Sequence, residues 1–326
     1  MTKRINIIDA DTLCVSSAAQ VQKNTLEVIH KATGKSKEFK NITELKSVMK
    51  AKGTLDQLDT LEIKTKVEVE PVEFALSSVK RKLERINDAI QADKTIIVVG
   101  GKATYRQALP LPSPYKNNRS EKPVHLAACK EYLVKHKGAY VVNGIEADDE
   151  TTILSEEYKK DGWEVFLSSP DHDSFQMHGI TLFNYKEDDP IKATIDLDGH
   201  WFDVIKKGTY NKSVGSGVGY LAGAMLYGDP TDTYNPTEIV GIRYGMMAAK
   251  KDLASCKEPK DFLSVVKEKY QEWYPNDVTY TAWDGKTYVK NWREILQMFF
   301  QCAYMLRSRD DEANAKKFFA YYGVKL

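Results

Sequence analysis

The chain has 326 residues, of which 42% are hydrophobic, and a formal net charge of +1 at pH 7. This length predicts one large domain or two ordinary ones, and the balanced charge argues against a general polyanion-binding surface. Neither a run of roughly 20 apolar residues nor a signal-peptide pattern is present, so we expect no membrane helix and no secretion. The four cysteines are far apart and the six histidines lack metal-ligand spacing, which excludes a disulfide scaffold and a zinc site and favours a reducing, cytoplasmic compartment.

Short β-branched and aliphatic runs, typical of buried parallel strands, alternate with amphipathic helical patterns in the first part of the chain. The strands are expected at residues 5–8, 95–99, 140–142, 165–167 and 181–183. The helices are expected at residues 73–92, 123–135 and 148–160. This alternation predicts an α/β fold with a doubly wound, mainly parallel sheet.

Residues 21–70 depart from that alternation. Their period-two pattern and Gly34 predict a small β-hairpin inserted after the first strand. Beyond about residue 205 the chain becomes rich in Gly and Ser and then helical, with helices expected at residues 238–251, 258–272, 290–307 and 309–322. We therefore expect two domains, an α/β core over residues 1–205 and a helical region over residues 206–326.

Charge is strongly segregated along the chain. Residues 101–123 carry a net charge of +4 with two interleaved tyrosines, whereas residues 143–173 carry −8. A solvated helix face explains some of these acids, but others flank strong strand signals, where like charges would crowd one another. Bound divalent cations would remove that repulsion, and the basic segment would hold a polyanionic strand against the acids. Three prolines at 110, 112 and 114 predict that the basic segment is a loop.

The unusual acids follow the ends of successive strands, where ligands of open α/β sheets gather. They are Asp9, Glu146, Asp148, Asp149, Asp171 and Asp173, joined by Asp229 and Asp232 in the segment GDPTD. If residues 171–173 are extended, both of their aspartates lie on one face. A carboxylate set without Cys or His favours Mg²⁺ or Mn²⁺ over zinc. Two such ions can orient water and stabilise an in-line phosphoryl transition state, so the pattern indicates phosphodiester chemistry.

The order of motifs, IID near the start and then YKNNRSEKP, GIEADDETT, SSPDHDSFQM and GDPTD, resembles the 5′→3′ exonuclease and flap endonuclease family. The resemblance runs from about residue 4 to 255 and is nearest to stand-alone phage enzymes similar to the nuclease domain of bacterial DNA polymerase I. It implies a PIN-like fold whose helical C-terminal region carries a divergent helix-hairpin-helix-type DNA-binding element. It also implies a nuclease with two divalent ions that acts during replication on DNA with 5′ ends or flaps, or on RNA–DNA hybrids with RNase H activity, in a bacterial or phage-infected cytoplasm.

The same resemblance implies roles for individual residues. The first metal would be held by Asp9, Glu146 and Asp148, with Asp149 as the neighbouring acid. The second would be held by Asp171, Asp173 and Asp229, with Asp232 nearby. Two catalytic cations of an arch over residues 102–122 would be Lys116 and Arg119. The expected DNA-binding residues are Lys102, Arg106, Tyr115, Lys122, Gly241 and Arg243.

The chain departs from the family pattern at two places. Gly101 stands where the family carries an aspartate, and Arg243 stands where a glycine of the duplex-binding turn is expected, so a potassium site is not expected there. Asp11 lies two residues after Asp9 and is a further candidate metal ligand that would compensate for the missing acid. The alternative for Asp11 is a cap on the helix that follows.

Three other functions compete with the nuclease. A weakly active or non-catalytic relative that binds branched DNA as a replication or repair accessory protein would explain the missing acid at Gly101. A PIN-type toxin ribonuclease would also use clustered acids, but the chain length and the helices after GDPTD argue against it. An interaction-only module gives no reason for acids at strand ends.

Overall fold

The computed structural model describes residues 2–119 and 121–326. They fall into two compact units, one made of Met1–Thr12, Glu84–Glu121 and Val134–Leu326, the other of Leu13–Leu83 and Lys122–Leu133. The chain passes between the units within α1 (Asp11–Gln20), α3 (Val72–Ile90) and α4 (Leu126–Lys137), and also between Glu121 and Lys122. Residues on both sides of position 205 lie in the same unit, so the separate helical domain over residues 206–326 stays a prediction.

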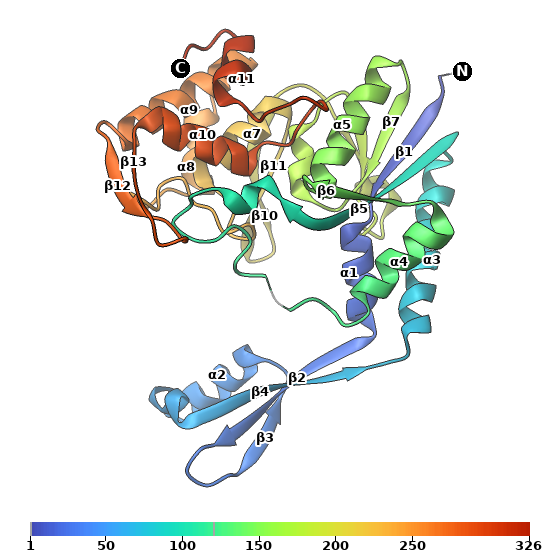
Figure 1. The fold of residues 1–326 in the computed structure, drawn as a ribbon, viewed down its shortest axis with the longest axis vertical. Coiled ribbons are helices and arrows are strands. Elements are labelled where there is room, and N and C mark those ends of the chain that lie inside the picture. The colour runs from blue at the N-terminus through green and yellow to red at the C-terminus, as the bar shows by residue number, and fades with distance from the viewer. Residues whose placement is uncertain (1, 120) are drawn as a thin grey trace. The chain divides into compact units, whose positions relative to one another are not determined.

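A six-stranded sheet forms the centre of the larger unit, in the order β6-β5-β1-β7-β8-β9 (Figure 1). The strands are β1 (Arg4–Asp9), β5 (Lys94–Thr104), β6 (Tyr140–Gly144), β7 (Glu164–Ser168), β8 (Ile180–Phe183) and β9 (Thr194–Leu197). Every pairing is parallel except that of β8 with β9. The expected mixed α/β fold with a mainly parallel sheet is confirmed. Strands β5 and β6 lie on one side of β1 and strands β7, β8 and β9 on the other, so the strand order reverses at β1. Such a reversal opens a crevice at the carboxyl ends of the strands.

Strand β1 is central because its side chains suit burial on both faces. Ile5, Ile7 and Ile8 are fully buried. The one polar residue among them, Asn6, is also buried, and its Oδ1 accepts a hydrogen bond of 2.7 Å from Ser168 Oγ on β7. Helix α5 (Ala147–Lys160) packs against β1, β5 and β7. The start of α5 thereby lies near the end of β1, which brings distant acids together.

The C-terminal part of the larger unit is built around α7 (Gly217–Tyr227), which packs against α8, α9, α10 and the hairpin β10–β11. The elements are β10 (Trp201–Lys207), β11 (Tyr210–Ser216), α8 (Met246–Leu253), α9 (Pro259–Trp273), β12 (Val278–Thr281), β13 (Thr287–Lys290), α10 (Trp292–Ala303) and α11 (Ala315–Tyr321), after a short α6 (Pro190–Ala193). The helix expected from residue 238 begins only at Met246, after turns in which Gly241 has φ of 66°. A helix-hairpin-helix element stays a prediction.

Sequence analysis noted that the segment of α7 is rich in glycine but predicted no helix there. These glycines are needed for close packing. A Cβ added to Gly219 would lie 2.5 Å from backbone atoms of Trp201, closer than any real contact. Ten of the eleven residues of this helix are buried, so α7 is the central core helix of this region.

The smaller unit contains an antiparallel sheet in the order β3-β2-β4. Its strands are β2 (Gln22–His30), β3 (Ser36–Phe39) and β4 (Leu61–Val69), and a helix α2 (Ile42–Ala51) and a 3-10 helix (Leu55–Thr60) separate β3 from β4. The expected hairpin is present as β2–β3, with Gly34 at φ of 67° in its turn. The third strand and the helix were not predicted, and they close a small core of Val28, Phe39, Leu45 and Met49.

No helix among the described residues is both long and apolar enough to cross a membrane.

The packing of α7 predicts that Gly219→Ala lowers the free energy of unfolding by about 1–3 kcal/mol, because the added methyl group meets backbone that cannot rotate away. Urea unfolding measures this loss. The control is Gly245→Ala, where an added Cβ meets no atom within 4 Å and the loss should stay below about 1 kcal/mol. Equal losses in the two variants would contradict the packing role of Gly219.

Candidate metal and nucleic-acid site

A pocket of about 210 Å³ opens at the carboxyl ends of the central strands. Five carboxylates line it: Asp148, Asp171, Asp173, Asp229 and Asp232. They come from the start of α5, from the segment after β7 and from the turn after α7. The structure therefore brings together acids from three of the segments that the sequence singled out, and we call this cavity the acid pocket.

Asp9 lies at the end of β1 and is only 2% exposed. Its Oδ1 accepts a hydrogen bond of 3.1 Å from the backbone N–H of Asp11, and its Oδ2 accepts one of 3.3 Å from Ser169 Oγ. Asp9 and Asp148 also interact directly through their side chains. Asp9 thus belongs to the same group of acids although it does not line the acid pocket itself.

Asp171 and Asp173 are not on an extended segment, so the condition under which both would lie on one strand face is not met. Asp171 is the N-cap of a 3-10 helix, His172–Gln176, and its Oδ1 accepts a hydrogen bond of 3.1 Å from the backbone N–H of Asp173. Both side chains still line the acid pocket. Asp229 and Asp232 share a turn that Asp229 and Tyr234 close through two backbone hydrogen bonds.

Burial and mutual repulsion raise the pKa values of these acids. Burial, followed by the charge of Asp11, raises the pKa of Asp9 to about 7. Burial, followed by the charges of Asp9 and Asp171, raises the pKa of Asp148 well above its usual range. On the other side, burial and the charge of Asp171 raise the pKa of Asp173.

Asp171 therefore repels acids in both groups. Burial and the charge of Asp232 likewise raise the pKa of Asp229. The acids form one continuous cluster of repelling charges, which favours the binding of protons or cations.

Two basic residues of the 109–119 segment compensate part of the negative charge of these acids. Lys116 Nζ pairs with Glu146 Oε1 and lies 3.6 Å from Asp232 Oδ2. Arg119 Nη2 lies 3.2 Å from Asp232 Oδ1. Burial opposes the charge of Lys116, but Asp232 and Glu146 outweigh it and raise its pKa. These are the two residues expected to be the catalytic cations, and both line the acid pocket.

The cluster suits a hard divalent cation, because its candidate ligands would bind through carboxylate oxygens, which such cations prefer. Within residues 2–119 and 121–326, however, no three Asp, Glu, His or Cys side chains are close enough together to hold a metal ion. Lys116 occupies one oxygen of Glu146 instead. A bound cation would have to draw the carboxylates closer and displace this contact.

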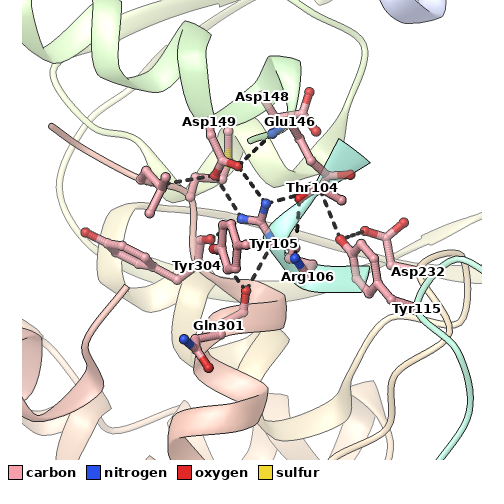
Figure 2. A network of polar contacts seen from close by, with 12 residues as sticks. Thr104, Tyr105, Arg106, Tyr115, Glu146, Asp148, Asp149, Asp232, Gln301 and Tyr304 are labelled. Atoms are coloured by element: carbon pink, nitrogen blue, oxygen red, sulfur yellow. Dashed lines mark hydrogen bonds and ion pairs between the residues drawn. The ribbon is translucent and has the colours of Figure 1, made fainter. Parts of the chain in front are cut away.

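Arg106 and Asp149 form a buried ion pair, shown in Figure 2, and both predictions for them need correction. Arg106 Nη1 donates to Asp149 Oδ2 at 2.6 Å, and Nη2 donates to Asp149 Oδ1 at 2.8 Å. Asp149 is fully buried and also accepts from the backbone N–H groups of Glu146 and Leu306. Arg106 is therefore not placed to bind DNA, and Asp149 has no oxygen left for a metal.

The same arginine fastens the C-terminal end of α10. Its Nε donates to the carbonyl of Gln301 at 3.1 Å, and its Nη2 donates to that of Tyr304 at 2.6 Å. In Figure 2 the carboxylate of Asp148 points away from this network. The adjacent acids of GIEADDETT thus have different tasks: Asp148 faces the acid pocket and Asp149 holds the fold together.

Tyr115, expected to bind DNA, is also buried, and its hydroxyl donates to Asp232 Oδ2 at 2.6 Å. Lys102 and Arg243 are exposed in the larger unit, and Lys122 is exposed in the smaller one. Their contacts with DNA and that of Gly241 stay predictions. The basic segment has no α-helix between residues 109 and 119, as its prolines predict; Ser120 lies outside the described residues.

Gly101 lies within β5, at a position that has no room for the aspartate that the family carries. A Cβ at Gly101 would lie 2.1 Å from Asn143 Oδ1 and 2.5 Å from the carbonyl oxygen of Val142. Asp11 instead accepts a hydrogen bond of 2.9 Å from the backbone N–H of Gly100. Its charge raises the pKa of Asp9, so it lies beside the first group of acids, and its binding to metal stays a prediction.

Sequence analysis missed Lys186 and His172, which also line the acid pocket. Lys186 follows the end of β8, so the argument from strand ends could have found it had it been applied to bases as well as acids.

No family model matches the chain, and no curated protein matches it. Among solved structures, bacteriophage T5 flap endonuclease in complex with DNA and metal ions has a TM-score of 0.48 and 13% identity, over 83% of this chain and 86% of that one. T5 5′-exonuclease with bound zinc has a TM-score of 0.45 and 14% identity, over 82% and 85%. Both bear names of the family that the motifs resemble. Since the identities and TM-scores are low, the function is argued from the residues of this chain.

The Arg106–Asp149 pair predicts a large, shared loss of stability. Asp149→Ala and Arg106→Ala should each lower the free energy of unfolding by about 3–5 kcal/mol, because each leaves a buried charge without its partner. The double variant should lose much less than the sum of the two losses. Urea unfolding of all three measures this. Lys192→Ala, which breaks an exposed pair with Asp189, is the control and should cost under about 1 kcal/mol. Additive losses would contradict the pairing.

The raised pKa of Asp9 predicts how stability depends on pH. Because its folded pKa of about 7 exceeds its ordinary value of 3.8, its contribution to stability is complete below pH 3.8 and is lost as the pH rises through about 7. Without metal at about pH 8, Asp9→Asn should therefore melt roughly 2–4 °C above the wild type, and the gap should shrink near pH 5. Added Mg²⁺ should raise the melting temperature of the wild type more than that of the variant.

Thermal melts in EDTA and in Mg²⁺ test the prediction for Asp9. Asp277→Asn, at an exposed position, is the control and should follow the wild type throughout. A gap between Asp9→Asn and the wild type that does not change with pH would refute the role of Asp9 ionisation.

Proposed function

We propose that the chain is a divalent-metal-dependent nuclease that hydrolyses phosphodiester bonds at 5′ ends or 5′ flaps of DNA. The observation that carries the proposal is the acid pocket, where largely half-buried carboxylates from separate segments repel one another beside Lys116 and Arg119. Acids alone would suit several cation sites. Here the carboxylates would bind divalent cations, and Lys116 and Arg119 at the edge of the pocket could hold a phosphate. This combination suits the hydrolysis of a phosphodiester bond.

The acids divide into two ligand groups in this proposal. Asp9, Glu146 and Asp148 would hold one ion. Asp171, Asp173 and Asp229 would hold the second, with Asp232 beside them. Mg²⁺ or Mn²⁺ bound there would supply Lewis-acid polarisation of the phosphate and a nucleophilic water at neutral pH. Asp149 is left out because Arg106 uses both of its oxygens.

The chain's own cations would bind and orient the scissile phosphate. Lys116 has three donors on a flexible stem, and Glu146 and Asp232 hold its ammonium at the edge of the acid pocket. If these carboxylates held a metal ion, the ammonium would be free to bind a phosphate oxygen. Arg119, whose side chain is 56% exposed, can reach a neighbouring oxygen with two donors. Together they would offset the charge that develops in the transition state.

Finer features of the proposal rest on the motifs. The helical region over residues 206–326 would bind duplex DNA, with Gly241 and Arg243 in its turn. RNA–DNA hybrids, as in primer removal with RNase H activity, are included as substrates, and replication is the setting proposed.

A second candidate is a weakly active branched-DNA-binding accessory protein. Two observations favour it: Gly101 leaves no room for an acid, and Lys116 pairs with Glu146, one of the expected metal ligands. Cleavage assays with Mg²⁺ or Mn²⁺ separate the candidates, because the accessory protein would bind a 5′ flap without turnover.

Asp171 provides the sharpest test, since it repels both groups of acids. Asp171→Ala should lower the cleavage rate on a 5′-flap substrate at least about 100-fold while flap binding in EDTA stays within about twofold. The matched control Asp277→Asn, at an exposed acid, should cleave as the wild type does. A nicked duplex and an RNA–DNA hybrid, measured in parallel, define the substrate range. Undiminished turnover by Asp171→Ala would remove the acid pocket as the active site.

A further inference from the structure

A second cavity, of about 420 Å³, adjoins the acid pocket. The two share Pro170, His172 and Lys186 in their walls. The second cavity differs in charge, because three lysines line it: Lys186, Lys207 and Lys212. We call it the lysine cavity. The proposed function uses none of its residues apart from those it shares with the acid pocket.

The hairpin β10–β11 presents two of the lysines on one face. Lys207 pairs with Tyr210 across the hairpin, and Lys212 pairs with Ile205, two residues before Lys207. Residues two apart on a strand, and the residues directly opposite them, point to the same face. Lys207, Tyr210 and Lys212 therefore form one surface, and all three line the cavity.

The charges in the lysine cavity are not balanced. Glu187 is the one acid in its lining, against three lysines. Lys186, Lys207 and Lys212 all act on the ring of His172, whose pKa is lowered first by burial and then by these charges. Lys212 is half-buried, and burial and the charge of Lys207 lower its pKa. The lysines thus repel one another across the cavity, as the carboxylates do in the adjoining acid pocket. A bound anion would reduce this repulsion.

We propose that the lysine cavity binds a backbone phosphate of the nucleic-acid strand, adjacent to the phosphate that lies at the acid pocket. This inference rests on the proposed nuclease function and names the part of the substrate that this surface holds. A strand that crosses the shared wall would place one phosphate at the acids and the next at the lysines. Point-charge contacts between lysine and phosphate need no fixed geometry, which suits an exposed hairpin.

Two features favour a polynucleotide over a free anion. The cavity continues into the acid pocket through shared residues, so a connected ligand can occupy both. Tyr210, with 57% of its surface exposed, lies among the lysines, and an exposed ring offers a base a stacking surface. Inorganic phosphate would use the lysines alone.

The test measures binding of a fluorescent 5′-flap DNA in EDTA over a range of salt concentrations, so it needs no cleavage. The double variant Lys207→Gln/Lys212→Gln should weaken binding several-fold at about 100 mM salt and reduce the salt slope by about 0.7–0.9, the value for one lost phosphate contact. Lys206→Gln is the matched control. It removes one positive charge one residue before Lys207 on the same strand, outside the cavity lining, and should leave both quantities unchanged.

A further variant guards against misfolding. Lys207→Arg/Lys212→Arg keeps the charge and should bind as the wild type does. If the glutamine double variant matches Lys206→Gln in affinity and slope, the lysine cavity does not bind phosphate. Flaps with a 5′-phosphate or a 5′-hydroxyl distinguish a terminal phosphate from an internal one. A loss confined to the phosphorylated flap assigns a terminal phosphate, and an equal loss assigns an internal one.

The two proposals fail differently. A wild-type chain that neither binds nor cleaves nucleic acid sinks the proposed function. A wild-type chain that cleaves, with a Lys207→Gln/Lys212→Gln variant that binds equally well at every salt concentration, sinks only the phosphate contact.

Discussion

The repulsion among buried carboxylates is the constraint on which the rest of the structure depends. Asp9, Asp148 and Asp173 lie where burial and like charge both raise their pKa. A group of this kind destabilises the fold unless protons or cations compensate it. Lys116 and Arg119 supply part of that compensation, and protons or cations from the solution would supply the rest. The region that costs stability is the one that we propose to be reactive.

The position of the acids follows from the sheet. Strand β1 is buried and pairs in parallel with β7. The carboxyl ends of the two strands therefore lie side by side, at the point in the sheet where the strand order reverses. Arg106 then anchors the start of α5 through Asp149, which fixes where Asp148 and Glu146 lie. Charged residues therefore have two roles here. A fully satisfied ion pair holds the frame, and an unsatisfied cluster within that frame is available to a ligand.

The sequence predicted the frame well and its details less well, for physical reasons. Apolar runs such as residues 5–8 have few alternatives to a buried strand, and acids after such runs must gather at one edge of the sheet. Arg106 was assigned to DNA because a charge in the sequence does not reveal a partner 43 residues away. Helix α7 was missed because glycine signals both a loop and close packing, and only Trp201 against Gly219 decides between them.

The contacts of Arg106 with the carbonyls of Gln301 and Tyr304 bear on how this chain could have been assembled in evolution. A residue next to the acid pocket satisfies the end of a helix almost two hundred positions later in the sequence. A detached α/β core would expose that guanidinium and lose the hydrogen bond that the backbone N–H of Leu306, just after α10, donates to Asp149. The C-terminal helices are thus no exchangeable module added to a self-sufficient catalytic core. Gene fusions or truncations that tolerate loss elsewhere would have to preserve this joint.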